Sequence, residues 1–119
     1  MTMNKMWKLT VMYDLLPGAN HEEFVKWRTT DHQKENMSSP GVLRSDFYIV
    51  EEGWPNKEPL QRYITEAYFP DEESLRAAFF SDETQAKLLG PEGIETIANH
   101  IFLISREVVS EDAAEVIDT

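Results

Sequence analysis

The stretch NHEEFVKWRTTDHQKEN, residues 20–36, is the starting point for predicting the fold. On a helix at about 100° per residue, one arc mixes apolar and polar side chains: Phe24, Val25, Arg28, His32 and Glu35, with His21 and Asp31 at its edges. The opposite arc is wholly polar: Glu22, Lys26, Thr29, Thr30, Gln33 and Lys34. Arg28 and His32 thus share the stripe that Phe24 and Val25 mark as interior, where a charge needs a partner or a ligand. We expect this helix to border a pocket.

One strand is predicted before this helix and one after it. Residues 6–13 alternate with period two, which places Trp7, Leu9, Val11 and Tyr13 on one apolar face. Asn20 followed by Glu23 predicts a helix N-cap. After the turn signal in residues 38–41, residues 42–51 form a second predicted strand, with two faces: Leu43, Phe47 and Ile49 against Arg44, Asp46 and Tyr48.

The second half of the chain predicts a similar succession of elements. Residues 52–59, EGWPNKEP, form an exposed loop in which Trp54 caps the pocket or packs on the sheet edge. Residues 60–69 form a third strand, Asp71 caps a helix, and Ser81 caps a shorter one. Residues 94–99 form one more helical turn, and residues 101–109 form the last strand. The domain therefore spans residues 1–109, and residues 110–119 are an acidic C-terminal tail.

The predicted order β-α-β-β-α-β is that of a ferredoxin-like α+β domain, with one antiparallel sheet and both helices on one face. The open face carries Met12 and Tyr48, together with some of four strand residues: Tyr63, Ile64, Ala67 and Tyr68. A half-apolar open face favours a partner, so we expect a homodimer through this face. The alternative is an exposed sheet in a monomer.

Composition limits the partners and the location of the protein. The formal net charge of -11 over 119 residues would repel nucleic acid and anionic membranes, so neither is expected as a partner. The sequence has no cysteine, which excludes thiolate nucleophiles and cysteine-based metal sites. No apolar run reaches membrane-spanning length, and the N-terminus lacks the apolar region of a signal peptide. We expect a cytoplasmic protein.

Two parts of the sequence carry a resemblance to a known superfamily. The pattern Phe24-x-x-Trp27-x-x-x-x-His32, followed by Pro40-Gly41 and a strand, resembles the first-helix motif of the dimeric α/β-barrel superfamily, in particular its EthD-like branch. Residues 68–79, YFPDEESLRAAF, and the following Ser-Asp-Glu are similar to that branch's second helix and the short helix after it. The resemblance covers roughly residues 9–108. This sequence departs from the commoner EthD-like pattern in having Asp31 just before the histidine and a long loop at residues 52–59.

This resemblance implies a homodimer whose two sheets pack face to face, with a small-molecule cleft between the sheet and the helices of each subunit. Related families include cofactor-independent monooxygenases, polyketide cyclases and muconolactone-type isomerases. The histidine at the end of the first helix commonly lines the cleft in cyclase-like and EthD-like members. His32 is the matching position in this sequence.

The candidate catalytic residues are His32, Tyr13 and Tyr68. A histidine with a reference pKa near 6.5 can act as a general acid or base, and a tyrosine hydroxyl can orient or protonate a substrate oxygen. The alternative for His32 is a structural role near a helix C-terminus. The alternative for the tyrosines is core packing.

The candidate substrate-binding residues are Arg28, Trp27, Phe24, Phe79 and His100. Arg28 can hold a carboxylate or an enolate oxygen, and its alternative is an internal ion pair with Glu35 or Asp31. Packing is the alternative role for the aromatic rings, and simple solvation is the alternative for His100.

No cofactor or metal is expected. His21 and His32 are too far apart on the helix to share an ion, and no glycine-rich phosphate loop or nucleophile elbow is present. Two functions therefore stay open. One is a small cofactor-independent enzyme of cyclase, isomerase or monooxygenase type, acting on a hydrophobic carbonyl- or phenol-bearing molecule by proton transfer at His32. The other is a non-catalytic small-molecule-binding or stress-related dimeric protein.

Overall fold

The computed structural model describes residues 5–113. Its elements, in chain order, are β1 (Trp7–Leu15), α1 (His21–Thr29), α2 (Asp31–Met37), β2 (Arg44–Ile49), β3 (Tyr63–Phe69), α3 (Glu72–Phe79), α4 (Asp82–Leu89), the 3-10 helix η1 (Ile94–Thr96) and β4 (Ile97–Arg106). The predicted acidic tail lies largely outside the described residues. No helix within the described part of the chain is long and apolar enough to cross a membrane.

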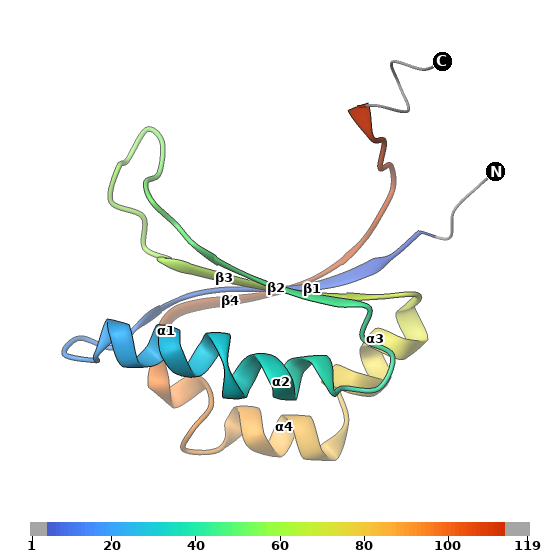
Figure 1. The fold of residues 1–119 in the computed structure, drawn as a ribbon, viewed down its shortest axis with the longest axis horizontal. Coiled ribbons are helices and arrows are strands. Elements are labelled where there is room, and N and C mark those ends of the chain that lie inside the picture. The colour runs from blue at the N-terminus through green and yellow to red at the C-terminus, as the bar shows by residue number, and fades with distance from the viewer. Residues whose placement is uncertain (1–4, 114–119) are drawn as a thin grey trace.

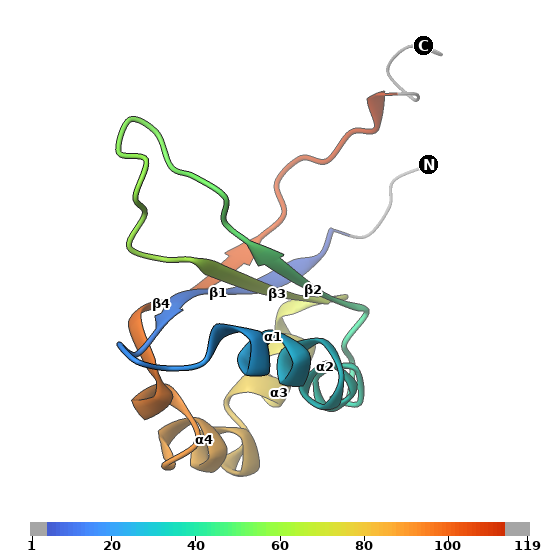
Figure 2. The same ribbon diagram turned by 60° about the vertical axis from the view of Figure 1, so that its left-hand side comes forward.

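The four strands form one antiparallel sheet in the order β2-β3-β1-β4. All the helices lie on one face of this sheet, and the other face is left open (Figures 1 and 2). This arrangement is the predicted ferredoxin-like α+β fold.

The strand register decides which side chains face the helices. Tyr13 of β1 lies opposite Tyr63 of β3, and Trp7 lies opposite Phe69, so these rings share the helix-covered face. The side chains of β1 alternate as predicted, and Met12 points to the open face beside Tyr48 and Ile64. Tyr63 is therefore a core residue of the covered face and not part of the open one.

The predicted single helix over residues 20–36 is wrong, because the chain breaks at Thr30 into α1 and α2. Thr30 has φ -118° and ψ -89°, and its N–H donates to the Trp27 carbonyl. The hydroxyls of Thr29 and Thr30 donate to the Val25 and Lys26 carbonyls at 2.7 Å and 2.6 Å. Such side-chain bonds to the preceding turn compete with the regular helix and bend it.

The predicted helix starts are confirmed. Asn20, Asp71 and Ser81 each accept a backbone N–H through the side chain, at the beginnings of α1, α3 and α4. The predicted helical turn after residue 93 is η1, and β4 begins at Ile97, earlier than predicted. The pairing of β1 with β4 shifts between Met12 and Asp14, because two steps along β1 match three along β4, from Ile101 to Ala98. The extra residue of this bulge therefore lies in β4, and the early part of β4 still pairs with β1.

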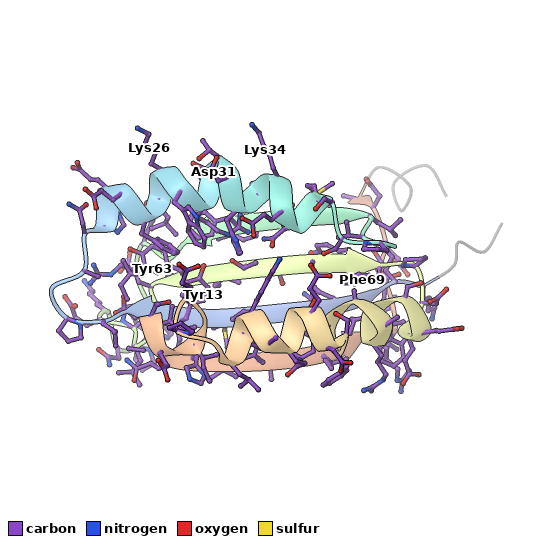
Figure 3. The ribbon with its side chains drawn as sticks, turned by 90° about the horizontal axis from the view of Figure 1, so that it is seen from below. Tyr13, Lys26, Asp31, Lys34, Tyr63 and Phe69 are labelled. Carbon is purple, nitrogen blue, oxygen red and sulfur yellow. The ribbon has the colours of Figure 1, made fainter. Side chains whose placement is uncertain are left out.

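The core lies between the sheet and the helices. Its buried apolar residues include Tyr13, Tyr63, Phe69 and Leu75, and Arg28 is only 1% exposed. Viewed from the helix side, Tyr13 and Tyr63 lie between the two helical segments, whereas Lys26, Asp31 and Lys34 point outward (Figure 3). The predicted division of the first helical segment is therefore confirmed for Lys26 and Lys34, whereas Asp31, predicted at the edge of the interior arc, is exposed.

Candidate functional site

A buried guanidinium lies at the centre of the site. Arg28 donates from Nη1 to the Gln33 side-chain oxygen at 2.7 Å and from Nε to the Thr65 hydroxyl at 3.3 Å. Its Nη2 donates to the Asp46 carbonyl at 3.4 Å, and the guanidinium lies 4.8 Å from the centre of the Phe47 ring. All of these partners are neutral.

The alternative that Arg28 pairs with Glu35 or Asp31 is wrong. Across residues 5–113, no carboxylate lies within ion-pair distance of Arg28. Burial lowers the pKa of Arg28 from its usual value, and the nearby Tyr13 hydroxyl opposes that shift. Arg28 is therefore a buried cation that backbone and side-chain dipoles stabilise in place of a counter-ion.

Gln33 is a functional candidate that the sequence placed on the wrong arc. Besides accepting from Arg28, it donates to the Ser45 carbonyl at 3.0 Å, and the Ser45 hydroxyl donates to it at 3.4 Å. A regular helix through residue 36 would turn Gln33 to solvent; the break at Thr30 turns it to the sheet. The consecutive threonines 29 and 30 are the sequence signal for that break, since threonine side chains favour helix ends.

Tyr13 joins the same hydrogen-bonded group. Its hydroxyl is hydrogen-bonded to the Thr65 hydroxyl at 3.1 Å, so Thr65 links Tyr13 to Arg28. The Tyr13 ring meets Phe24 edge-to-face at 6.0 Å. Burial raises the pKa of the Tyr13 hydroxyl, which therefore stays protonated near neutral pH.

A second buried phenol, Tyr63, is bonded to a histidine. The Tyr63 hydroxyl is hydrogen-bonded to Nδ1 of His21, and the two rings stack at 5.6 Å. The ring centres of Phe24 and Tyr63 are 5.0 Å apart. Because the Phe24 ring also contacts the Tyr13 ring, it connects the His21–Tyr63 pair with Tyr13. The sequence placed His21 at the edge of the interior arc but did not connect it with a phenol, because their contact joins residues 42 positions apart.

His32 packs against Trp27 on the neighbouring helix. The two rings stack with centres 4.3 Å apart and planes inclined by 21°. Nδ1 of His32 is buried without a hydrogen-bond partner, and the nearest Glu35 carboxylate oxygen is 3.7 Å away. Burial and then the charge of Arg28 lower the pKa of His32, while Glu35 opposes this. The ring is therefore largely neutral at pH 7 and has one nitrogen able to accept a proton.

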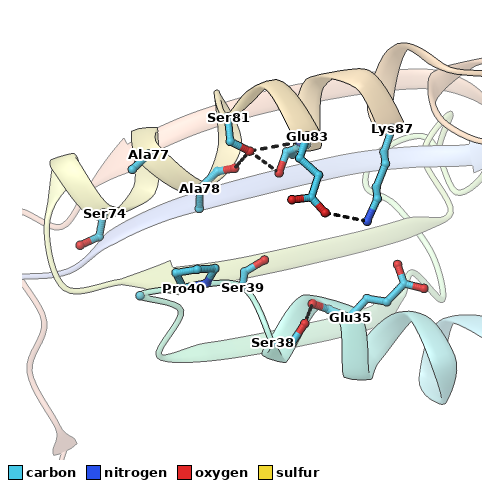
Figure 4. Close-up of a pocket in the computed structure, with 12 residues that line it drawn as sticks. Glu35, Ser38, Ser39, Pro40, Ser74, Ala77, Ala78, Ser81, Glu83 and Lys87 are labelled. Carbon is cyan, nitrogen blue, oxygen red and sulfur yellow. Dashed lines mark hydrogen bonds and ion pairs between the residues drawn. The ribbon is translucent and has the colours of Figure 1, made fainter.

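A groove of about 600 Å³ separates the end of α2 from α3 and α4. Its walls are mostly small and hydroxyl-bearing, with three charged side chains (Figure 4): Glu35, Ser38, Ser39, Pro40, Gly41, Ser74, Ala77, Ala78, Ser81, Glu83, Thr84 and Lys87. Glu83 and Lys87 form an ion pair at 3.6 Å on the α4 wall. Glu35 belongs both to this groove and to the surroundings of His32.

The structure brings together only part of the predicted site. Arg28, Tyr13, Phe24, Trp27 and His32 form one continuous cluster through Thr65 and through ring contacts. Among the residues that the structure describes, no tyrosine hydroxyl is hydrogen-bonded to His32.

Tyr68, Phe79 and His100 lie outside this cluster. Tyr68 is on the open face of the sheet, where its hydroxyl donates to Glu66 at 3.5 Å, so its predicted position near the helices is wrong. Phe79 packs on Phe102 at 6.0 Å. His100 is exposed and lies within β4, not in a loop before it; its ring meets Phe102 at 5.8 Å.

Three solved structures show what this chain is similar to in fold. An EthD family protein from Bacillus halodurans has a TM-score of 0.66 and 24% identity, covering 87% of this chain and 99% of that one. A hydroxynitrile lyase from Passiflora edulis has a TM-score of 0.66 and 11% identity, covering 92% and 99%. A dimeric ferredoxin-like protein of unknown function from Jannaschia has a TM-score of 0.60 and 16% identity, covering 87% and 99%.

No protein-family model and no curated protein matches the sequence. At these identities the structural likeness establishes the fold and leaves the activity open. The predicted resemblance to EthD-like proteins is confirmed at that level, because the chain folds like an EthD family protein and like ferredoxin-like proteins described as dimeric.

Proposed function

We propose that this protein is a small enzyme that needs no cofactor and moves a proton with His32 on a hydrophobic molecule bearing a carbonyl or phenol group. The observation that carries the proposal is the buried, unpaired Nδ1 of His32, whose neighbour Glu35 also lines a groove of about 600 Å³. A neutral imidazole can take a proton from a carbon next to a carbonyl and return it to another atom of the same molecule. The sum of these two steps is an isomerisation. If the carbanion first adds to a second carbonyl carbon of the same molecule and the resulting alkoxide takes the proton, the sum is a cyclisation, also without change of redox state.

The surroundings of His32 support this role. Trp27 stacks on the ring and fixes its plane, and the depressed pKa keeps a basic nitrogen available at pH 7. Arg28 and Tyr13 lie deeper in the same cluster and can stabilise negative charge that develops on a substrate oxygen. One structural neighbour is named as a hydroxynitrile lyase, so hydroxynitriles join carbonyl compounds and phenols as candidate substrates.

Turnover of a compound panel tests this proposal. Aromatic ketones, phenols, polyketide-like carbonyl compounds and hydroxynitriles are incubated with the protein and with two variants, His32→Ala and Lys34→Ala. Lys34 is the control because it lies on the same helix and points to solvent. We expect His32→Ala to lower turnover about 100-fold or more, because a general acid or base contributes about that much. A folded His32→Ala variant with full activity would overturn the proton-transfer role.

We further propose that the enzyme is a homodimer through the open face of the sheet. The open-face patch consists of Lys8, Thr10, Met12, Tyr48, Ile64, Glu66, Leu103 and Ser105 and forms a shallow hollow of about 500 Å³. Leu103 and Tyr48 are 45% and 47% exposed there, as expected for a surface that a partner covers. The Jannaschia protein of similar fold is described as dimeric.

A non-catalytic binding protein is the second candidate, and the Arg28 network favours it. Arg28 already has three acceptors and Tyr13 has Thr65, so this part of the cluster is satisfied without a ligand. In that case the panel yields ligands that raise the melting temperature but no turnover. His32→Ala would then weaken ligand binding without removing an activity.

A further inference from the structure

The segment between β2 and β3, residues 50–62, stands off the sheet on the side opposite the helices (Figures 1 and 2). We call it the arm. Its Trp54 side chain is 89% exposed and its Leu60 side chain is 66% exposed. A tryptophan ring buries more apolar area than almost any other side chain when it is covered, so this exposure leaves a large contact unused in the single chain.

Hydrogen bonds within the arm and to β4 give it a defined shape. The Val50 N–H donates to the Arg62 carbonyl at 2.7 Å, which continues the strand pairing into its base. The Gly53 N–H donates to the Lys57 carbonyl at 3.3 Å and closes the tip. Gln61 donates to the Asn99 carbonyl at 3.0 Å, tying the arm to β4. An arm that is already ordered loses little conformational entropy when it binds.

We propose that the arm clamps a second copy of this chain, with Trp54 packed against the partner subunit. The inference rests on the homodimer of the proposed function, because the arm borders the open-face patch and extends it beyond the edge of the sheet. The segment that follows β4 also rises from the sheet on the side opposite the helices (Figure 1). Its Val108 and Val109 side chains are 58% and 72% exposed. A partner on the open face would therefore lie between the arm with its exposed Trp54 and the segment with exposed Val108 and Val109.

Charge on the open face indicates that the partner is another copy. The face carries two ion pairs, Lys8 with Glu66 at 2.8 Å and Arg44 with Asp46 at 2.9 Å, so these four charges sum to zero. The chain as a whole carries a net charge of -11, which makes two copies repel each other elsewhere on their surfaces. A two-fold axis can place the cation of each copy near an anion of the other, which is the self-complementarity that a symmetric interface requires.

The first experiment measures dimer dissociation by sedimentation for the full chain, Trp54→Ser and the control Lys34→Ser. Trp54 is so exposed in the protomer that its replacement leaves the protomer folded, which circular dichroism verifies. We expect Trp54→Ser to raise the dissociation constant about tenfold or more, because buried interface tryptophans are among the residues that contribute most to binding. Lys34→Ser should leave the constant unchanged.

The second experiment follows the arm itself with thiol chemistry. Because the sequence has no cysteine, a single introduced cysteine is the only reactive thiol. Lys57→Cys places it on the exposed tip of the arm, and Lys34→Cys places it on the outer face of α2. With a coloured disulfide reagent, we expect Lys57→Cys to react several-fold more slowly in the dimer than after dilution to monomers, and Lys34→Cys to react equally in both.

The outcomes separate the arm from the dimer on which it depends. A dimer that weakens with Trp54→Ser and protects Lys57→Cys supports the clamp. A dimer that does neither overturns the clamp and leaves the dimeric enzyme standing. A chain that sediments as a monomer at all concentrations overturns both.

Discussion

The Nη1 atom of Arg28 donates to the side-chain oxygen of Gln33 at 2.7 Å, so the buried cation of this fold is held by a neutral amide. The two residues lie on different helices, because Thr30 separates α1 from α2. The bond therefore fixes the angle between those helices as well as satisfying the charge.

Gln33→Ala should lower the free energy of unfolding by about 2 kcal/mol, because it leaves the buried Arg28 without its closest acceptor. Chemical denaturation with urea measures the change. Lys34→Ala, the exposed neighbour on α2, should change stability by no more than about 0.5 kcal/mol. Equal effects of the two substitutions would show that Arg28 finds another acceptor when Gln33 is absent.

His32 should make the protein less stable as the pH falls below neutrality. Burial holds the pKa of His32 below its value in the unfolded chain, about 6.5, so the unfolded state binds a proton first. The stabilisation is present above pH 6.5 and is lost as pH falls through 6.5 toward the folded pKa. Between pH 7.5 and 5.5, the wild type should therefore lose more stability than His32→Gln.

The matched control for this prediction is His100→Gln, which replaces an exposed histidine on β4. It should retain the full pH-dependent loss seen in the wild type. If His32→Gln loses as much stability as the wild type over this range, then His32 titrates normally and its burial has no energetic effect.

Asn20→Ala should destabilise the protein by about 1 kcal/mol, because the Asn20 side chain caps α1 by accepting the Glu23 N–H at 3.0 Å. Asn20→Asp retains an acceptor at this position and should restore most of the loss. Thermal unfolding of the three proteins measures the difference. Failure of the aspartate to restore stability would mean that the loss comes from another contact of Asn20.

Gly41→Ala should be more destabilising than Gly18→Ala. Both glycines have a positive φ, 83° and 87°, so an alanine at either position costs about 1–2 kcal/mol of backbone strain. Only at Gly41 would the added Cβ also lie 3.2 Å from the Cβ of Ser74, whereas nothing lies within 4 Å at Gly18. Denaturation of both variants tests this, and equal losses would show that α3 moves aside freely.

The sequence predicted the fold because its local signals agree with one another. Period-two alternation predicted the apolar face of β1, and the side chains of Asn20, Asp71 and Ser81 predicted where the three longest helices begin. The order of the elements then allowed few ways to arrange four strands and two helical segments. These features depend on neighbours in the chain, so the sequence contains them directly.

The site was predicted only in part, since its contacts join distant segments. Arg28 was placed in the interior by its position in the helical repeat, but its partners Thr65 and Asp46 come from β3 and β2. Gln33 was assigned to the solvent side because a regular helix was assumed through Thr30. Tyr68 was assigned to the site, and the register of β3 turns it to the open face.

By itself, the sequence determined the order of the elements, their caps, and the presence of Arg28 and His32 on an interior stripe. Only the tertiary structure decided which groups satisfy Arg28, that His21 meets Tyr63, and that Nδ1 of His32 is left without a partner. The physical reason is the range of the interactions. Periodicity and capping are set within one or two turns of the chain, whereas the burial and hydrogen bonding of a polar side chain depend on residues brought together by the sheet.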